Sequence, residues 1–283
     1  MRLSTTILSP RQVYSHLGDY GLVIVDCRFE LSDPDWGLLE YQKGHLPGAV
    51  YADLNKDLSG PITPTSGRHP LPDPEKFIQK AGEWGINSRS QVIVYDQDGG
   101  AYASRLWWLL RTYGHEAVAV LDGGIPAWLE AGYTLSSQKV SLKPAEFEGY
   151  PDPNQWVTTA EMELLLNDPS FIFIDARASE RFRGEVEPID RIAGHIPGAV
   201  NRPYTENLSS DGMLLLKEQL HQAFDDLLGK LSPDRIVTYC GSGVTSCHHL
   251  LAMEIAGLYG AKLYVGSWSE WIRDPSRPIA TGD

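Results

Sequence analysis

The stretch Ile236-Val237-Thr238-Tyr239-Cys240-Gly241-Ser242-Gly243-Val244-Thr245-Ser246 decides the expected fold of the second half of this chain. Its first four residues are apolar or β-branched and predict a short buried strand. From about Val244 the pattern becomes helical, and it closes at Gly257. Between the two, Gly241 and Gly243 are expected to turn the chain with positive φ, which few other residues tolerate. The stretch therefore predicts a strand, a tight loop and a helix, with a cysteine at the end of the strand.

Cys240 is expected to face a ring of backbone N–H groups at the amino end of the following helix. Such a ring stabilises an anion, and the helix dipole adds to the effect. A thiol placed there should have a lowered pKa and be a thiolate near neutral pH. The alternative is that Cys240 is a small buried hydrophobic residue, as most free cysteines are. The residues expected to supply the N–H groups are Gly241, Ser242, Gly243, Val244 and Thr245.

Length and composition narrow the class of protein. A chain of 283 residues, 42% hydrophobic and 22% charged, is typical of a soluble globular protein with two domains. The net charge of −13 disfavours nucleic acid or an anionic membrane as a partner. Three cysteines, Cys27, Cys240 and Cys247, suit a reducing compartment. No apolar run approaches the roughly 18 residues of a transmembrane helix. The apolar run among the first residues is too short for the core of a signal peptide, so we expect a cytoplasmic protein.

The chain contains an internal repeat. Its two halves share a capping box that opens a helix, at Ser9 and at Thr158. They also share apolar strands and a Gly-His-[Leu/Ile]-Pro-Gly-Ala-Val turn, in the paired residues 22–26 and 171–175, 44–50 and 194–200, and 92–96 and 236–240. A duplicated domain explains these matches. We expect a first domain at 1–137, a linker at 138–155 and a second domain at 156–283.

Each half reads helix, strand, loop, strand, helix, strand, helix, strand, helix. Apolar strands that alternate with amphipathic helices predict an α/β fold, with a parallel sheet covered by helices on both faces. Ligands of such sheets bind beyond the carboxyl ends of the strands. Cys240 follows one of these ends, so its predicted position agrees with its predicted reactivity.

The repeated Asp-x-Arg and Gly-His segments, the Leu-Asp-Gly-Gly string at 121–124 and the Cys240 loop resemble those of tandem-domain rhodanese sulfurtransferases. The resemblance covers essentially the whole chain. It implies an enzyme that moves a sulfane sulfur from a small donor to a thiophilic acceptor through a Cys240 persulfide. The implied acceptors are cyanide or a thiol, with thioredoxin as a candidate. We also expect a monomer without a cofactor.

The loop Cys-Gly-Ser-Gly-Val-Thr is more similar to the 3-mercaptopyruvate branch of that family than to the thiosulfate branch, which typically has Arg-Lys after the cysteine. The resemblance therefore favours 3-mercaptopyruvate as the donor. Two alternatives stay open: a thiosulfate:cyanide sulfurtransferase, and a persulfide carrier that acts with protein partners.

In that family two arginines hold the carboxylate of the donor. Arg181, six residues after Asp175, matches the first, with a surface salt bridge as the alternative role. The second follows a Pro-Glu-Pro run, which is shortened here and ends at Arg191. We expect Arg181 to bind the donor and leave the second cation open between Arg191 and Arg183.

The resemblance also implies a serine–histidine–aspartate relay that reaches from the loop to the first domain. His69 occupies the matching histidine position, and Ser242 the serine position. The aspartate position falls on Asn55, and an amide does not stabilise an imidazolium as a carboxylate does. Whether the relay operates is left open.

The first half is expected to be catalytically silent because Asp96 stands where the second half has Cys240. A carboxylate cannot carry a sulfane sulfur. Two other classes of site are disfavoured. A rhodanese-like phosphatase needs an arginine that binds phosphate with two hydrogen bonds, and Ser246 stands at that position here. A metal site is not expected, because Cys240, Cys247, His248 and His249 lie on one loop and helix and cannot converge on an ion.

Overall fold

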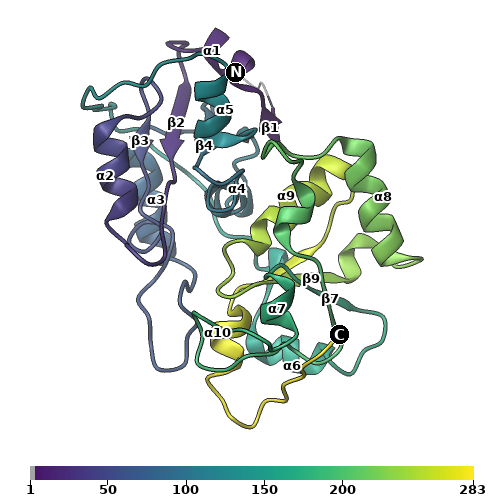
Figure 1. Ribbon diagram of the computed structural model, residues 1–283. Coiled ribbons are helices and arrows are strands. Elements are labelled where there is room, and N and C mark those ends of the chain that lie inside the picture. The colour runs from purple at the N-terminus through teal and green to yellow at the C-terminus, as the bar shows by residue number, and fades with distance from the viewer. Residues whose placement is uncertain (1–3) are drawn as a thin grey trace. The chain divides into compact units, whose positions relative to one another are not determined.

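The computed structural model describes residues 4–283, which form two compact α/β units (Figure 1). The first unit runs to Gly60 and includes Pro72–Asp152 and Ser209–Leu214. The second contains Pro61–Leu71, Pro153–Leu208 and Leu215–Asp283. The units therefore follow the sequence repeat with two exchanges. Residues 61–71 pack with the second unit, and residues 209–214 pack with the first.

The first unit is built on a five-stranded parallel sheet in the order β1-β5-β4-β2-β3. Its strands are β1 (Ile7–Leu8), β2 (Leu22–Asp26), β3 (Val50–Tyr51), β4 (Gln91–Tyr95) and β5 (Val118–Leu121). Its helices are α1 (Pro10–Ser15), α2 (Trp36–Lys43), α3 (Pro74–Glu83), α4 (Ala103–Thr112) and α5 (Gly124–Glu130).

The second unit repeats this topology strand for strand, in the order β6-β10-β9-β7-β8. Its strands are β6 (Trp156–Val157), β7 (Ile172–Asp175), β8 (Ala199–Asn201), β9 (Ile236–Tyr239) and β10 (Lys262–Tyr264). Its α-helices are α6 (Thr159–Leu165), α7 (Ser179–Phe182), α8 (Lys217–Leu228), α9 (Ser246–Ala256) and α10 (Ser267–Trp271). Three 3₁₀ turns, η1 (Pro153–Gln155), η2 (Tyr204–Asn207) and η3 (Pro233–Arg235), complete it. The identical strand order confirms the predicted pair of parallel α/β domains.

Two features differ from the sequence expectation. The edge strands β1 and β6 were not predicted, because two residues are too few to show a strand pattern. Helix α2 replaces a predicted loop. Only Gly37 of this helix is buried, so the sequence has no apolar stripe that would predict the helix.

The longest helix within residues 4–283, α8, has 12 residues, and no helix in this range is long and apolar enough to cross a membrane.

The hydrophobic core of each unit lies along its central strand. In the first unit, Ile93 and Tyr95 of β4 pack with Trp128 of α5 in one buried cluster. In the second, Val237 and Tyr239 of β9 pack with the two tryptophans of α10 in the equivalent cluster. Helix α9 packs against β9 and β10. Because β9 is buried along its whole length, the backbone that carries Cys240 is held on every side.

The repeated Asp-x-Arg motif joins each sheet to the Gly-His turn. Arg177 forms a buried ion pair with Asp175, at 2.6 Å between Nη2 and Oδ2, and donates from Nη2 to the carbonyl oxygen of Gly194 at 2.7 Å. Arg28 makes the same contacts with Asp26 and the carbonyl oxygen of Gly44. Both halves contain this arrangement, so these residues recur for a structural reason.

Candidate active site

The loop after β9 is shaped by two glycines that act in different ways. Gly243 has a φ of 76°, and a Cβ there would lie 2.6 Å from the carbonyl oxygen of Val265. Gly241 does not have positive φ, so that expectation was wrong. Its lack of a side chain matters for another reason: a Cβ would lie 2.7 Å from Nη2 of Arg68. Gly241 therefore leaves room for a guanidinium group beside Cys240.

The Cys240 side chain is 2% exposed, and polar groups surround its sulfur. Burial is the largest influence and raises the pKa of this thiol. Against it act the hydroxyl groups of Ser246 and Thr245 and the N–H groups of Ser242 and Ser246, and the resulting pKa lies below the ordinary value. The Oγ atom of Ser246 donates to Sγ at 3.5 Å.

The groups around the sulfur overlap only in part with those expected from the sequence. Ser242 and Thr245 act on the thiol, but Thr245 does so through its hydroxyl group. Ser246 was missed as a donor. Its position at the start of α9 was the available signal, because a hydroxyl and an N–H group there both face the preceding loop.

Helix α10 makes three hydrogen bonds with the backbone of the loop. The N–H group of Cys240 donates to Oγ of Ser267, and the N–H groups of Trp268 and Ser269 donate to the carbonyl oxygens of Cys240 and Gly241 at 3.0 and 2.9 Å. Ser267 has a φ of 53°, the one non-glycine residue in residues 4–283 with positive φ. Such a conformation costs on the order of 1–3 kcal/mol and is retained where the surroundings impose it. These contacts fix the backbone of the loop to the first turn of α10.

His69 contacts the loop directly. Its Nδ1 atom lies 2.8 Å from Oγ of Ser242, and both side chains are buried. The segment that carries it is fixed to α10, because the N–H groups of Gly67 and Arg68 donate to the side chains of Glu270 and Ser269. The structure thus brings together the histidine and serine that the sequence resemblance paired.

A chain of alternating charges runs from the end of β7 to the rim of the loop. Arg177 bridges Asp175 and Glu187; Arg181 bridges Glu187, at 2.8 Å, and Asp190, at 3.2 Å; Arg68 closes the chain with an ion pair to Asp190. Arg181 therefore lies beside Gly241 of the loop, closer than the sequence suggested, and sequence reasoning did not select Arg68. The missing signal was spatial, since Arg68 comes from residues 61–71, which pack with the second unit.

The two carboxyl groups at the outer end of this chain differ in pKa. Burial is the largest influence on both. It raises the pKa of Asp190, although Arg68 and Arg181 oppose the effect. For Glu187 the hydrogen bonds outweigh burial: Arg181 and the N–H groups of Asp190 and Ile189 hold its pKa below the usual value.

The two other candidate cations make their hydrogen bonds elsewhere. Nη2 of Arg191 donates to the carbonyl oxygens of Ile272 and Arg273. Arg183 forms an exposed ion pair with Glu185 at 2.8 Å. The contacts of these two arginines therefore run to the end of α10 and to a neighbouring surface carboxylate.

In the first unit a carboxylate fills the position that corresponds to the thiol. Asp96 follows β4 and is fully buried. Its two oxygens accept four backbone N–H bonds of 2.7–2.9 Å, from Asp98, Gly100, Tyr102 and Ala103. Burial raises the pKa of Asp96, and these hydrogen bonds oppose it. The loop of this unit therefore binds its own side chain as the anion.

The buried histidines of α9 form a hydrogen-bonded cluster. Nδ1 of His248 and Nδ1 of His249 both lie within 3.2 Å of Nδ2 of Asn207, and Nε2 of His249 lies 2.7 Å from the carbonyl oxygen of Arg202. Burial lowers the pKa of His249 to about 3. Within residues 4–283 no group of three or more His, Cys, Asp or Glu side chains is arranged to hold a metal ion.

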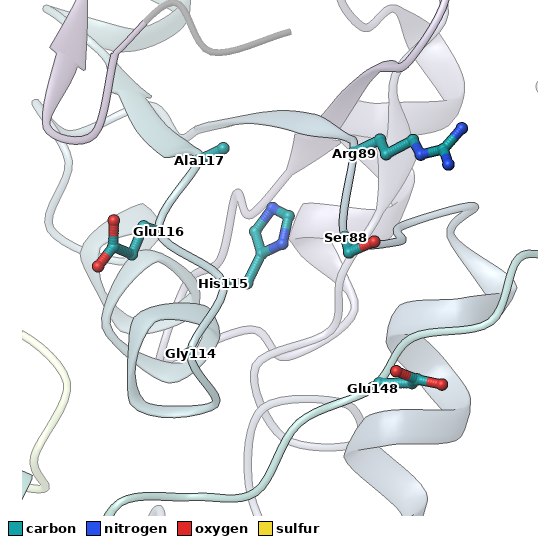
Figure 2. Close-up of a pocket in the computed structure, with 7 residues that line it drawn as sticks. All are labelled: Ser88, Arg89, Gly114, His115, Glu116, Ala117 and Glu148. Atoms are coloured by element: carbon teal, nitrogen blue, oxygen red, sulfur yellow. The ribbon is translucent and has the colours of Figure 1, made fainter.

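A cavity of about 560 Å³ lies in the first unit, at the amino ends of β4 and β5 (Figure 2). His115 lies among its lining residues, and burial lowers the pKa of this histidine. Figure 2 shows the side chains of Arg89 and Glu116 extending away from His115 on opposite sides. This edge of the sheet is opposite to the one where ligands of parallel α/β sheets bind. The thiol of the second unit is therefore the better candidate for chemistry.

Two homologous parallel α/β units, one with an acidic thiol after its central strand and one with a carboxylate there, define a duplicated thiol-dependent enzyme with one reactive unit. The rhodanese-like domain family matches residues 9–131 and 158–274. A probable 3-mercaptopyruvate sulfurtransferase of Pseudomonas aeruginosa is 49% identical over 99% of both chains. A thiosulfate sulfurtransferase of Cricetulus griseus is 35% identical over 93% of this chain and 89% of its own. The chain belongs to the rhodanese family, as a tandem-domain sulfurtransferase.

A solved structure agrees with this assignment. The 3-mercaptopyruvate sulfurtransferase from Leishmania major superposes with a TM-score of 0.82 at 33% identity, over 94% of this chain and 74% of its own. Both the predicted fold and the predicted enzyme class are thus confirmed.

Proposed function

We propose that Cys240 is the nucleophile of this sulfurtransferase and that 3-mercaptopyruvate is its favoured donor. The observation that carries the proposal is the buried Cys240 thiol, whose pKa the Ser246 hydroxyl and the loop N–H groups lower. A thiolate is the reactive form of cysteine, and a lowered pKa populates it at neutral pH. A relative named as a probable 3-mercaptopyruvate sulfurtransferase aligns over 99% of this chain.

In the first half-reaction the thiolate of Cys240 attacks the sulfur of the donor. The new S–S bond forms as the C–S bond of mercaptopyruvate breaks, and the electron pair of that bond leaves as the enolate of pyruvate. The proton of the donor thiol is released and a proton is taken up at the methylene carbon. The products are pyruvate and a Cys240 persulfide. The Ser242–His69 pair, joined at 2.8 Å, is suited to move this proton or to hold the enolate oxygen.

In the second half-reaction the acceptor attacks the outer sulfur of the persulfide. Cyanide becomes thiocyanate, or a thiol becomes a persulfide, and the electron pair of the broken S–S bond returns to Cys240 as a thiolate. We expect the groups that lower the pKa of the Cys240 thiol to stabilise the persulfide anion as well. Two steps through one covalent intermediate give ping-pong kinetics.

Thiosulfate is the second candidate donor, and one structural observation favours it. Arg68 and Arg181 bring positive charge to the loop although the loop itself has no basic side chain. Opposite charges about 4 Å apart attract by roughly 4 kcal/mol at an effective dielectric near 20. Asp190 and Glu187 neutralise these arginines, however, and a compact dianion gains less from a neutralised pair.

Steady-state kinetics with both donors tests the proposal. We expect a higher kcat/KM for 3-mercaptopyruvate than for thiosulfate, with cyanide as the acceptor and no protein partner present. A higher value for thiosulfate would reverse the donor assignment. Turnover that requires a protein partner would instead identify a persulfide carrier.

We further propose that the protein acts as a cytoplasmic monomer with a small thiol or a dithiol protein such as thioredoxin as its acceptor. All three cysteines are free thiols, as in proteins of reducing compartments. Sedimentation analysis tests the monomer, and thioredoxin-dependent release of pyruvate tests the acceptor.

A further inference from the structure

We infer that Arg68 joins Arg181, the arginine already expected from the sequence, in binding the anionic end of the sulfur donor, and that Asp190 between them selects a monocarboxylate over a dianion. The inference rests on the sulfur transfer proposed for Cys240 and assigns the donor-binding groups of that site. It gives Arg68 the role for which the sequence suggested Arg191 or Arg183.

Both guanidinium groups reach the residue that follows Cys240. From the position that a Cβ of Gly241 would occupy, Nη2 of Arg68 lies at 2.7 Å and Nη2 of Arg181 at 3.7 Å. Oδ2 of Asp190 lies at 3.8 Å from the same point. A donor whose sulfur approaches Cys240 therefore has its carboxylate within reach of both arginines.

One donor of the Arg68 guanidinium lacks a partner that a carboxylate would supply. Nη1 forms the ion pair with Asp190, on one side of the guanidinium. Nε is buried and has no hydrogen-bond partner within residues 4–283. Buried polar atoms without a partner are rare in native proteins and call for an explanation. A carboxylate bound across Nε and Nη2, the two-point geometry that arginine favours, would satisfy the buried atom at the Gly241 edge.

Two carboxylates of the protein hold the Arg181 side chain in place. Its Nε and Nη2 atoms donate to Glu187 at 2.8–3.1 Å, and Nη2 also contacts Asp190. Glu187 in turn accepts the N–H groups of Ile189 and Asp190, so the turn and the guanidinium are fixed together. A cation whose side chain is already ordered loses less conformational entropy when it binds a ligand.

The charges around the site set which anion is preferred. The chain of ion pairs contains three arginines and three carboxylates, so its formal charges cancel; its members are Asp175, Arg177, Glu187, Arg181, Asp190 and Arg68. A monocarboxylate brings one negative charge to this network, and thiosulfate brings two. Loss of the negative charge of Asp190 leaves a net positive charge, which favours the dianion more than the monoanion.

The arginine half of the inference is tested with Arg68→Ala and Arg68→Lys. We expect Arg68→Ala to raise KM for 3-mercaptopyruvate by about tenfold or more, as for the loss of a charge-assisted two-point contact. Arg68→Lys should recover only part of the loss, because an ammonium cannot form the fork. Arg235→Ala, at the amino end of β9, is the matched control for removal of one positive charge and should leave KM within about twofold.

Asp190→Asn tests the selectivity half. We expect the ratio of kcat/KM for thiosulfate to kcat/KM for 3-mercaptopyruvate to rise by about fivefold or more, since the dianion gains the larger attraction. An unchanged or lower ratio would contradict this role of Asp190. Pyruvate binding to Cys240→Ser, with and without Arg68→Lys, measures carboxylate affinity without turnover, and circular dichroism verifies folding.

Failure of the inference can be told apart from failure of the proposed function. If the wild-type enzyme forms no persulfide with either donor, the proposed function fails. The assignment of Arg68 is overturned if the wild-type enzyme is active and three results follow. Arg68→Ala and Arg68→Lys would then both have the KM of the wild type, and Arg191→Ala would have a higher KM. Equal pyruvate affinity of the Cys240→Ser protein with and without the added Arg68→Lys substitution would also overturn it.

Discussion

The Oγ atom of Ser246 lies 3.5 Å from the Sγ atom of Cys240, and it donates a hydrogen bond to that sulfur from the first residue of α9. Burial alone would keep this cysteine a neutral thiol. Ser246, Thr245 and the loop N–H groups reverse that effect. Through this hydrogen bond the first residue of α9 therefore influences the reactivity of Cys240 at the end of β9.

Ser246→Ala should raise the pKa of Cys240, by up to about one unit for the loss of one hydrogen bond to the thiolate. Because the thiolate exists above the pKa, the variant should lose reactivity at neutral pH and regain it at higher pH. The rate of alkylation by iodoacetamide as a function of pH measures this shift. Cys27 is the internal control: it is also 2% exposed, but burial and nearby carboxylates raise its pKa, so it should stay unreactive. Superimposable pH profiles of wild type and variant would contradict the role of Ser246.

His69→Ala should lower kcat for 3-mercaptopyruvate by roughly 10²-fold, the usual scale of proton-transfer assistance. The loss for thiosulfate should be much smaller, because sulfite leaves without protonation at carbon. His69→Asn, which keeps a hydrogen-bonding group near Ser242, separates proton transfer from simple packing. Parallel losses with both donors would assign His69 a structural role instead.

Asp96→Cys should not create a second reactive thiol. The loop of the first unit donates four N–H groups to two carboxylate oxygens, and a single sulfur cannot accept them all. Unsatisfied buried N–H groups cost about 1–3 kcal/mol each, so the variant should also be less stable to urea by several kcal/mol, about 2–5. Asp98→Cys, on the same loop but exposed, is the control substitution. A persulfide on residue 96 after donor treatment would refute the prediction.

The sequence predicts the fold where local patterns carry it. The strands 22–26 and 236–239, the capping boxes at Ser9 and Thr158 and the helix end at Gly257 all have the predicted form. Each depends on hydrophobic period, side-chain capping or glycine conformation, which are properties of neighbouring residues. The two-residue edge strands have no such pattern, and only the assembled sheet defines them.

The candidate site divides in the same way. Cys240 and its loop are visible in the sequence because strand, glycines and helix are contiguous. Arg68 is not, because it reaches the loop from a segment more than a hundred residues away, which the domain repeat assigns to the other half. For Gly241 the sequence predicts a positive φ, but its φ is ordinary. A glycine is needed there because the Arg68 side chain, distant in sequence, occupies the space beside it.

Mass spectrometry of the protein after treatment with 3-mercaptopyruvate shows whether sulfur passes through Cys240. We expect one added sulfur atom per chain, located on Cys240, released by cyanide and absent in Cys240→Ser. Cys27→Ser and Cys247→Ser should retain both the added sulfur and turnover. An added sulfur on another cysteine, or turnover that survives in folded Cys240→Ser, would rule out Cys240 as the residue that carries the sulfur.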